Sequence, residues 1–110
     1  MKRIDAIIRP ERLADVAAQL EANQLSGFTI SDVRGHGKTP GQTGEWRGQQ
    51  YELHVAHKLL VTLFVEDDEV TKALDAISAG ATTGSLGDGL IAVSEVGAMF
   101  RISPTTPASN

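Results

Sequence analysis

Lys58-Leu59-Leu60-Val61-Thr62-Leu63-Phe64-Val65 is the stretch of this sequence that decides the fold. The odd-numbered residues from Leu59 to Val65 give one apolar face of a β-strand, and the even-numbered residues from Leu60 to Phe64 give a second face that is also largely apolar. Because a layer of helices can cover only one face of a sheet, something else must cover the other. Another subunit is the simplest candidate.

The segments before this strand show a strand, a helix and a second strand. Residues 2–8 alternate in the manner of a strand, and apolar residues then recur at helical spacing between Pro10 and about Asn23. Pro10 suits the first helical position, and Glu11 complements the positive end of the helix dipole. Residues 28–35 form the next strand.

The segments after it repeat the same order. Asp67 or Asp68 can cap a helix whose buried stripe includes Val70 and Ile77, and Gly80 is expected to stop it. A strand follows over residues 90–96. The whole order, β-α-β-loop-β-α-β, is typical of a ferredoxin-like βαββαβ sandwich of the α+β class.

The chain of 110 residues has the size of one domain, which we place at residues 1–102. The tail at 103–110 is rich in proline and small polar residues, so we expect it to be disordered. Between the second and third strands, periodicity is lost and glycines recur. Residues 37–57 are therefore expected to form a long, flexible recognition loop, and an idle surface insertion is the alternative.

Thr82-Thr83-Gly84-Ser85-Leu86-Gly87-Asp88-Gly89 precedes the last strand. Its glycines allow positive φ and can turn backbone N–H groups outward, which suits a phosphate. Connecting turns use the same residues, so a purely structural turn is the other interpretation.

Composition excludes several function classes. The net charge is −4 and no cysteine occurs, so a basic nucleic-acid surface, a disulfide framework and a thiolate metal site are not expected. His36, His54 and His57 lack metal-ligand spacing, and we expect no metal site. No apolar run is long enough to span a membrane, and no signal-peptide pattern is present, so we expect a cytoplasmic protein without membrane insertion.

An enzyme and an RNA-binding module are the two alternatives to a binding protein. An enzyme would need a nucleophile paired with a base, or an oriented acid–base pair, and the sequence offers no catalytic residue of either kind. An RNA-binding module of this topology would need aromatic residues on the central strands, where this chain has leucine and valine instead.

The sequence resembles the PII signalling protein family over residues 1–102. The resemblance is carried by the opening stretch from Met1 to Pro10 and by Gly35-x-Gly37, Arg47-Gly48, Tyr51, Lys58 and Thr83-Gly84-x-x-Gly87-Asp88-Gly89. It implies a homotrimer with its sheets facing inward, adenine nucleotide bound in clefts between subunits, and a long loop that contacts a target transporter or enzyme. The resemblance therefore implies a sensor and not an enzyme.

The resemblance also implies a set of nucleotide-binding residues: Thr29, Gly35, Gly37, Lys38, Phe64, Thr83, Gly87, Asp88, Gly89 and Arg101. Three positions depart from the family pattern. Leu90 replaces a phosphate-binding lysine, Ser103 replaces an arginine, and Thr62 replaces a glutamate that contacts adenine. Because two cations are missing at the phosphate end, we expect ADP or AMP to bind at least as well as ATP.

A second effector is implied near Lys58 and Thr39. The family holds 2-oxoglutarate through a metal and a glutamine where this chain has Thr39, and a hydroxyl is a poorer ligand for a hard cation. A small anion such as bicarbonate is therefore the expected effector. Trp46, Arg47 and Tyr51 are expected to contact the partner. The alternative is a nitrogen-status PII protein that senses ATP and 2-oxoglutarate and is nucleotidylylated at Tyr51.

Overall fold

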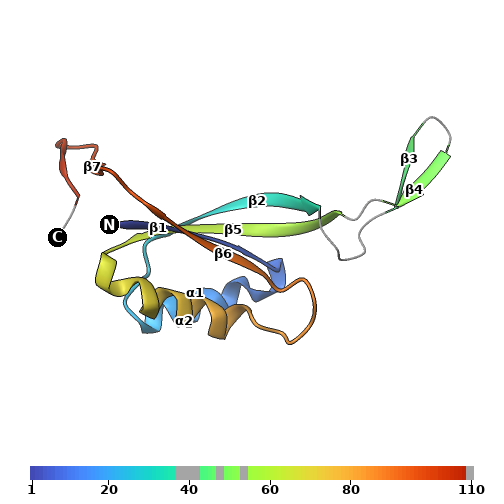
Figure 1. Ribbon diagram of the computed structural model, residues 1–110, viewed down its shortest axis with the longest axis horizontal. Helices are drawn as coiled ribbons and strands as arrows, with labels where there is room; N and C mark the ends of the chain where they lie inside the picture. The colour runs from blue at the N-terminus through green and yellow to red at the C-terminus, as the bar shows by residue number, and fades with distance from the viewer. Residues whose placement is uncertain (37–42, 47–48, 53–54, 109–110) are drawn as a thin grey trace.

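The computed structural model describes residues 1–36, 43–46, 49–52 and 55–108 (Figure 1). For residues 43–46 and 49–52 it describes the backbone only. The elements are β1 (Lys2–Ile8), α1 (Leu13–Ala22), β2 (Phe28–His36), β3 (Thr43–Trp46), β4 (Gln49–Glu52), β5 (Val55–Val65), α2 (Val70–Ala81), β6 (Gly89–Glu95), β7 (Phe100–Arg101) and β8 (Thr106–Pro107).

The main sheet has the strand order β2-β5-β1-β6, and all of its pairs are antiparallel. β5 lies between β1 and β2, with Ile4 opposite Leu63 on one side and Phe28 opposite Leu63 on the other. This arrangement confirms the ferredoxin-like α+β fold and the central role of the 58–65 strand. That strand begins earlier than predicted, at Val55, because β2 continues to His36 and pairs with it.

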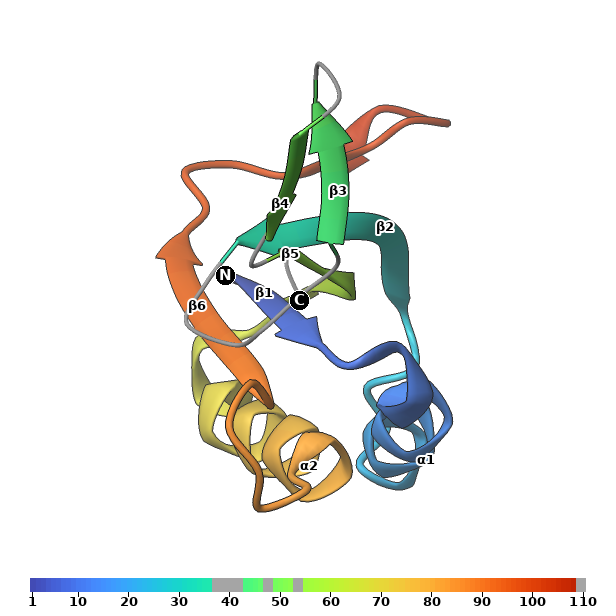
Figure 2. The same cartoon turned by 90° about the vertical axis from the view of Figure 1, so that its right-hand side faces the viewer.

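Both helices lie side by side on one face of the sheet (Figures 1 and 2). The core forms between this helix layer and the facing strand residues, and consists of Ile4, Ala6, Ile8, Val16, Leu20, Leu25, Leu59, Val61, Leu63, Val65, Ala73, Ala76, Ile77 and Ala81. The buried residues of β5 are the odd-numbered ones, as the alternation predicted. Burial of this apolar surface is the main force that holds the helices to the sheet.

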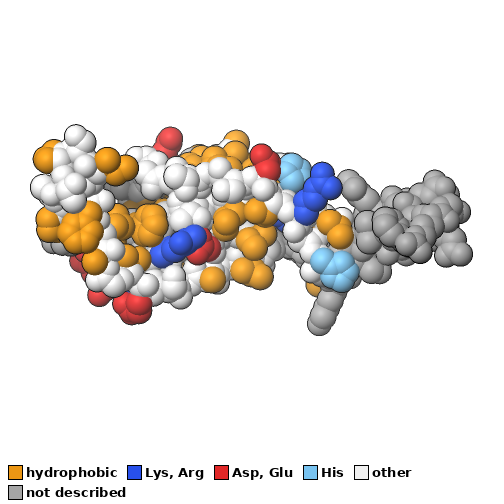
Figure 3. Space-filling model, turned by 90° about the horizontal axis from the view of Figure 1, so that it is seen from above, with side chains coloured by type: hydrophobic (Ala, Val, Ile, Leu, Met, Phe, Trp, Pro, Cys, Tyr) orange, Lys and Arg blue, Asp and Glu red, His pale blue; other side chains and the backbone are white. Residues whose placement is uncertain are grey.

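The opposite face of the sheet carries no helix (Figure 1). Figure 3 looks onto this face and shows apolar side chains over much of it, interrupted by neighbouring charged side chains of opposite sign. Phe64 and Leu90 point to this side, and are 44% and 59% exposed. The two-sided apolar character of the 58–65 strand is thus real, and its second face is open in a single chain.

Polar contacts near the middle of this open face link two strands. The Thr62 hydroxyl donates a hydrogen bond to Asp5 Oδ1 at 2.7 Å, and Arg3 Nε donates to Asp5 Oδ2 at 2.9 Å. The carboxylate of Asp5 is therefore held between a hydroxyl and a guanidinium.

The starts of both helices differ from the sequence predictions. Pro10 begins a short 3₁₀ turn that precedes α1, and is not the first residue of α1 itself. The turn before α2 is capped by Glu66, whose backbone N–H donates to the Glu69 carboxylate at 3.2 Å. Asp67, predicted as a cap, instead accepts a hydrogen bond from the N-terminal ammonium at 2.8 Å. Residues 66–69 are all acidic, and each of them could in principle cap the turn. The structure uses Glu66 and Glu69, which stand three residues apart as a capping box requires.

Gly80 does not stop the second helix, which continues to Ala81. A Cβ at Gly80 would lie 2.6 Å from the Cα of Val16 on α1. Gly80 therefore lies where the two helices approach each other closely, a role that helical spacing in a single segment does not reveal.

Two segments expected to lack regular structure contain paired strands. Within 37–57, β3 and β4 form an antiparallel hairpin, with Gly44 opposite Tyr51. Within the tail, β8 pairs with β7, so that Arg101 lies opposite Thr106. Part of the segment expected to be disordered, Thr106–Pro107, is thus drawn as a paired strand. Short strands of this kind arise from pairing with a partner segment, which local composition does not specify.

Candidate functional site

The loop at 82–89 joins the end of α2 to the start of β6 (orange in Figure 1). Thr82 ends the helix because its backbone turns to an extended conformation, with ψ of 129°. Its backbone N–H and its hydroxyl both donate to the Ser78 carbonyl, at 3.1 and 2.7 Å. Gly84, Gly87 and Gly89 have φ of 85°, 87° and 120°, values that favour glycine. The chain thereby reverses direction and enters β6 beside β1.

Asp88 organises this loop from within. Its Oδ2 accepts hydrogen bonds from the backbone N–H groups of Thr83, at 2.9 Å, and Gly84, at 3.2 Å. Its Oδ1 accepts from the Thr83 hydroxyl and pairs with Arg9 Nε at 3.1 Å. The hydrogen bonds from Thr83, together with the Arg9 guanidinium, hold the pKa of Asp88 well below its usual range. The carboxylate is therefore a charged, internal anchor of the loop.

Two cations approach the loop from the sheet. Lys58 Nζ donates to the Gly87 carbonyl at 2.5 Å, and Arg9 donates to the Leu86 carbonyl as well as to Asp88. Gly35 on β2 lies next to this lysine, since a Cβ there would be 3.9 Å from Lys58 Cγ. Five of the sequence-predicted residues, Gly35, Lys58, Thr83, Gly87 and Asp88, are thus brought together at one end of the sheet.

The loop also contains backbone donors that are not in use. The N–H groups of Leu86, Gly87 and Asp88 donate no hydrogen bond to any part of the chain that the structure describes. These three consecutive groups lie between Gly84 and Gly89, and consecutive N–H groups in a glycine-rich turn can together bind an anion. The amides of Thr83 and Gly84, by contrast, are occupied by Asp88. The geometry therefore fits a phosphate cradle at 86–88 more closely than one spread over the whole loop.

Three further predicted nucleotide-binding residues, Thr29, Phe64 and Arg101, lie toward the opposite end of the sheet. Thr29 is opposite Thr62, and its hydroxyl is 3.5 Å from the Thr62 carbonyl. Phe64 is two positions further along β5, and Arg101 is exposed on β7. Figure 1 shows the 82–89 loop at one end of β6 and β7 beyond the other end.

The two groups are too far apart to form one site within a single chain. Lys58 and Phe64 are six residues apart along β5, which corresponds to about 20 Å in an extended strand. The candidate residues therefore fall into two separate groups, which we call the candidate half-sites: one is the loop with its cations, and the other is Thr29, Phe64 and Arg101.

The remaining candidates are placed only in part. Trp46 lies at the end of β3 opposite Gln49, and Tyr51 lies on β4 opposite Gly44. Gly37, Lys38, Thr39 and Arg47 lie outside the described residues. Figure 1 draws the β3–β4 hairpin beyond the ends of β2 and β5.

Arg9 is the residue of this site that the sequence reasoning did not single out. It follows β1 directly and its side chain is 23% exposed. Its position just before Pro10, at the end of a strand, was the available signal, but its partner Asp88 is 79 positions away. Within the described residues, no group of three or more histidine, cysteine, aspartate or glutamate side chains is arranged to hold a metal ion. None of the helices in that part of the chain is long and apolar enough to cross a membrane.

Comparisons with known proteins agree with this architecture. The sequence model of the family described as Nitrogen regulatory protein P-II matches residues 1–106. A Nitrogen regulatory protein P-II of Microchaete diplosiphon is 43% identical over 102 residues, covering 93% of this chain and 91% of that protein. Nitrogen regulatory protein P-II 2 of Methanothermobacter thermautotrophicus is 40% identical over 102 residues, covering 93% of this chain and 89% of that protein. The crystal structure of Arabidopsis thaliana PII bound to citrate matches with a TM-score of 0.78 at 29% identity, over 97% of this chain and 84% of that chain.

Proposed function

Because this chain belongs to the nitrogen regulatory protein P-II family, we propose that it is a regulatory sensor that binds an adenine nucleotide between subunits of a homotrimer. In this proposal the nucleotide and a small anion bias the conformation of the 37–57 loop, and the loop controls a partner protein. A ligand has this effect only if it binds one loop state more tightly than the other.

The observation that carries the proposal is the separation of the two half-sites. The 82–89 loop, with Arg9 and Lys58, offers unused N–H groups for phosphates. The other half-site offers Phe64 and Thr29 for a base, and Arg101 for further phosphate oxygens. Since about 20 Å of β5 separates Lys58 from Phe64, a nucleotide that contacts both kinds of group must lie between two copies of the chain.

The open face of the sheet supports assembly into a trimer. It exposes Phe64 and Leu90 on the side without helices. An exposed apolar surface of this kind favours a protein interface. Facing sheets would bring the half-site of one copy toward the other half-site of its neighbour.

The phosphate end favours ADP or AMP over ATP. Leu90 stands directly after the loop, is exposed and is neutral. Ser103, the second position where we expected a missing cation, is also neutral. Since charge-assisted hydrogen bonds to phosphate contribute about 1.5–3 kcal/mol each, the most highly charged nucleotide loses most from their absence.

A small anion is the proposed second effector. Lys58 and Arg9 donate to the neighbouring carbonyls of Gly87 and Leu86, and together they supply positive charge beside the cradle. Bicarbonate needs no metal in this arrangement. The alternative effector is 2-oxoglutarate. It belongs to the alternative function, a nitrogen-status sensor that also binds ATP and is modified at Tyr51, and the names of the relatives favour this alternative.

The proposed target is a transporter or an enzyme in the cytoplasm, and the 37–57 loop contacts it through Trp46, Arg47 and Tyr51.

Calorimetric titration of the full chain with AMP, ADP and ATP, each with and without bicarbonate or 2-oxoglutarate, tests the proposal. We expect ADP or AMP to bind at least as tightly as ATP, and bicarbonate to alter nucleotide affinity. Tighter ATP binding that is strengthened by 2-oxoglutarate and magnesium would support the nitrogen-status reading. Absence of binding by all three nucleotides would overturn both.

A further inference from the structure

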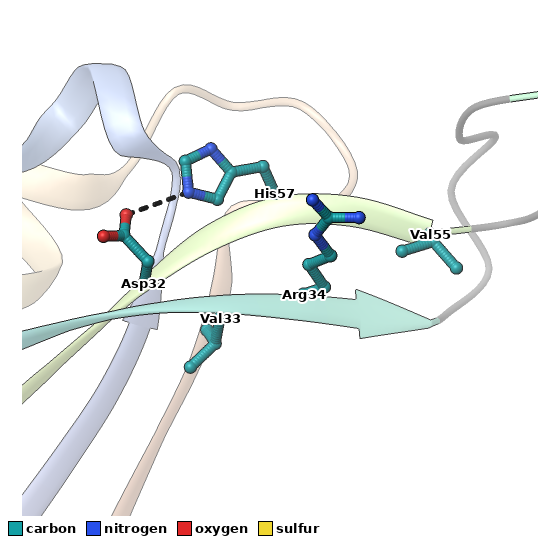
Figure 4. Close-up of a pocket in the computed structure, with 5 residues that line it drawn as sticks. All are labelled: Asp32, Val33, Arg34, Val55 and His57. Atoms are coloured by element: carbon teal, nitrogen blue, oxygen red, sulfur yellow. Dashed lines mark hydrogen bonds and ion pairs between the residues drawn. The ribbon is translucent and has the colours of Figure 1, made fainter.

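A second polar hollow lies away from the 82–89 loop, where β2 and β5 approach the hairpin. It has a volume of about 330 Å³ and is lined by Asp32, Val33, Arg34, Val55 and His57. Figure 4 shows Asp32, Arg34 and His57 on one side of the paired strands and Val33 on the other. Neither the nucleotide site nor the proposed effector site includes these residues.

Strand register explains why the charged groups converge there. Arg34 on β2 is directly opposite His57 on β5, so both side chains leave the sheet on the same face. Asp32 is two positions before Arg34 on the same strand and therefore also faces this side. Three chemistry-bearing side chains from two strands thus surround one hollow.

The three side chains differ in which of their hydrogen-bonding groups are already engaged within the chain. His57 Nε2 lies 3.0 Å from Asp32 Oδ1, so the carboxylate orients the imidazole ring. The other ring nitrogen, Nδ1, is not part of that contact. Arg34 is exposed and forms no ion pair or hydrogen bond within the part of the chain that the structure describes. Toward the described residues, the guanidinium therefore keeps all of its donors available.

The set of free groups is suited to a carboxylate. A guanidinium has five N–H donors and no acceptor, and it binds a carboxylate in a bidentate manner. Asp32 does not compete for it, because this carboxylate is engaged with His57. A cation, by contrast, would meet the unpaired positive charge of Arg34.

We infer that Arg34, with His57 beside it, forms a carboxylate-binding site at the base of the β3–β4 hairpin. The carboxylate can come from a small free acid or from an aspartate or glutamate side chain of a protein. The site is independent of the proposed nucleotide site, because Lys58, the cation of that site on β5, carries its side chain on the other face of the strand from His57.

The test uses nuclear magnetic resonance of the full chain, observing the Arg34 Nε–H group and the His57 ring. One titration uses succinate, a free dicarboxylate, and the other uses an N-acetylated hexaglutamate peptide, both at constant ionic strength. We expect saturable shifts at both residues with at least one probe. Saturation by succinate assigns a free acid as the source, and saturation by the peptide alone assigns a protein side chain.

Variants separate this site from general surface charge. Arg34→Ala should lower the affinity for the probe that saturates about ten-fold. Arg34→Lys should recover only part of this affinity, because lysine lacks the planar, bidentate guanidinium. Lys72→Ala removes the same charge from α2 and should have no effect. Equal losses in Arg34→Ala and Lys72→Ala, or absence of saturation with both probes, would overturn the inference. Arg34→Ala should leave AMP, ADP and ATP titrations unchanged, so the two proposals can fail separately.

Discussion

The backbone carbonyl of Ile7 occupies the space where a side chain at Gly89 would begin. A Cβ at position 89 would lie 1.8 Å from Ile7 O, and φ at this residue is 120°. The last residue of the candidate phosphate loop is therefore fixed as glycine by two independent constraints, one steric and one conformational.

We predict that Gly89→Ala lowers the free energy of unfolding by about 3 kcal/mol, because the clash with β1 adds to the backbone strain. Gly84 is the matched control. It also has positive φ, but a Cβ there meets nothing within 4 Å, so Gly84→Ala should cost only about 1 kcal/mol. Urea unfolding followed by circular dichroism measures both. Equal losses would show that strain alone, and not the close approach to Ile7, fixes position 89.

Gly80→Val should separate the two helices. The Cβ would lie 2.6 Å from Val16 Cα, and the backbone atoms of α1 cannot move aside without disturbing the core. We expect a loss of about 2–3 kcal/mol in the free energy of unfolding. Gly27→Val is the control, because a Cβ there has open space. A Gly80→Val protein as stable as the Gly27→Val protein would contradict the close helix contact.

Acid should weaken the loop through Asp88. Its folded-state pKa is lowered, so the stability that this carboxylate contributes is present above its unfolded pKa of about 3.9 and is lost as pH falls through the lower, folded-state pKa. The wild-type protein should therefore lose stability below about pH 4 more steeply than Asp88→Asn. Urea unfolding at a series of pH values from neutral into this acid range measures the difference. Parallel profiles for the two proteins would exclude Asp88 as an ionised anchor.

Leu90→Lys should shift nucleotide preference toward ATP. The new ammonium would stand directly after the loop, at an exposed position, and a charge-assisted contact there should raise ATP affinity about ten-fold relative to AMP. Leu90→Gln removes the same apolar side chain without adding charge and should leave the ratio unchanged. Calorimetry gives the ratio. An equal gain in affinity for AMP and ATP would show that the additional phosphates of ATP do not lie near position 90.

The strands and helices follow from local pattern where burial is periodic. The alternation in residues 2–8 and 58–65 and the helical spacing around Val16 and Ile77 are consequences of which side chains must leave water, and the structure places these elements accordingly. Local pattern did not predict the structure where contact with another segment of the chain decides the conformation. The β3–β4 and β7–β8 hairpins and the continuation of α2 through Gly80 belong to this class.

The candidate site divides in the same way. The glycines and hydroxyls at 82–89 could be identified from residue type, because glycine allows positive φ and outward backbone N–H groups. Lys58 and Phe64 became candidates only through the resemblance to the PII family. The sequence by itself thus determined the order of elements, the two apolar faces of the central strand and the composition of the loop. Only the tertiary structure decided that Arg9 pairs with Asp88, that Asp88 occupies the amides of Thr83 and Gly84, and that Arg34 faces His57. These pairings depend on the register between strands distant in the sequence, and side-chain polarity alone does not encode that register.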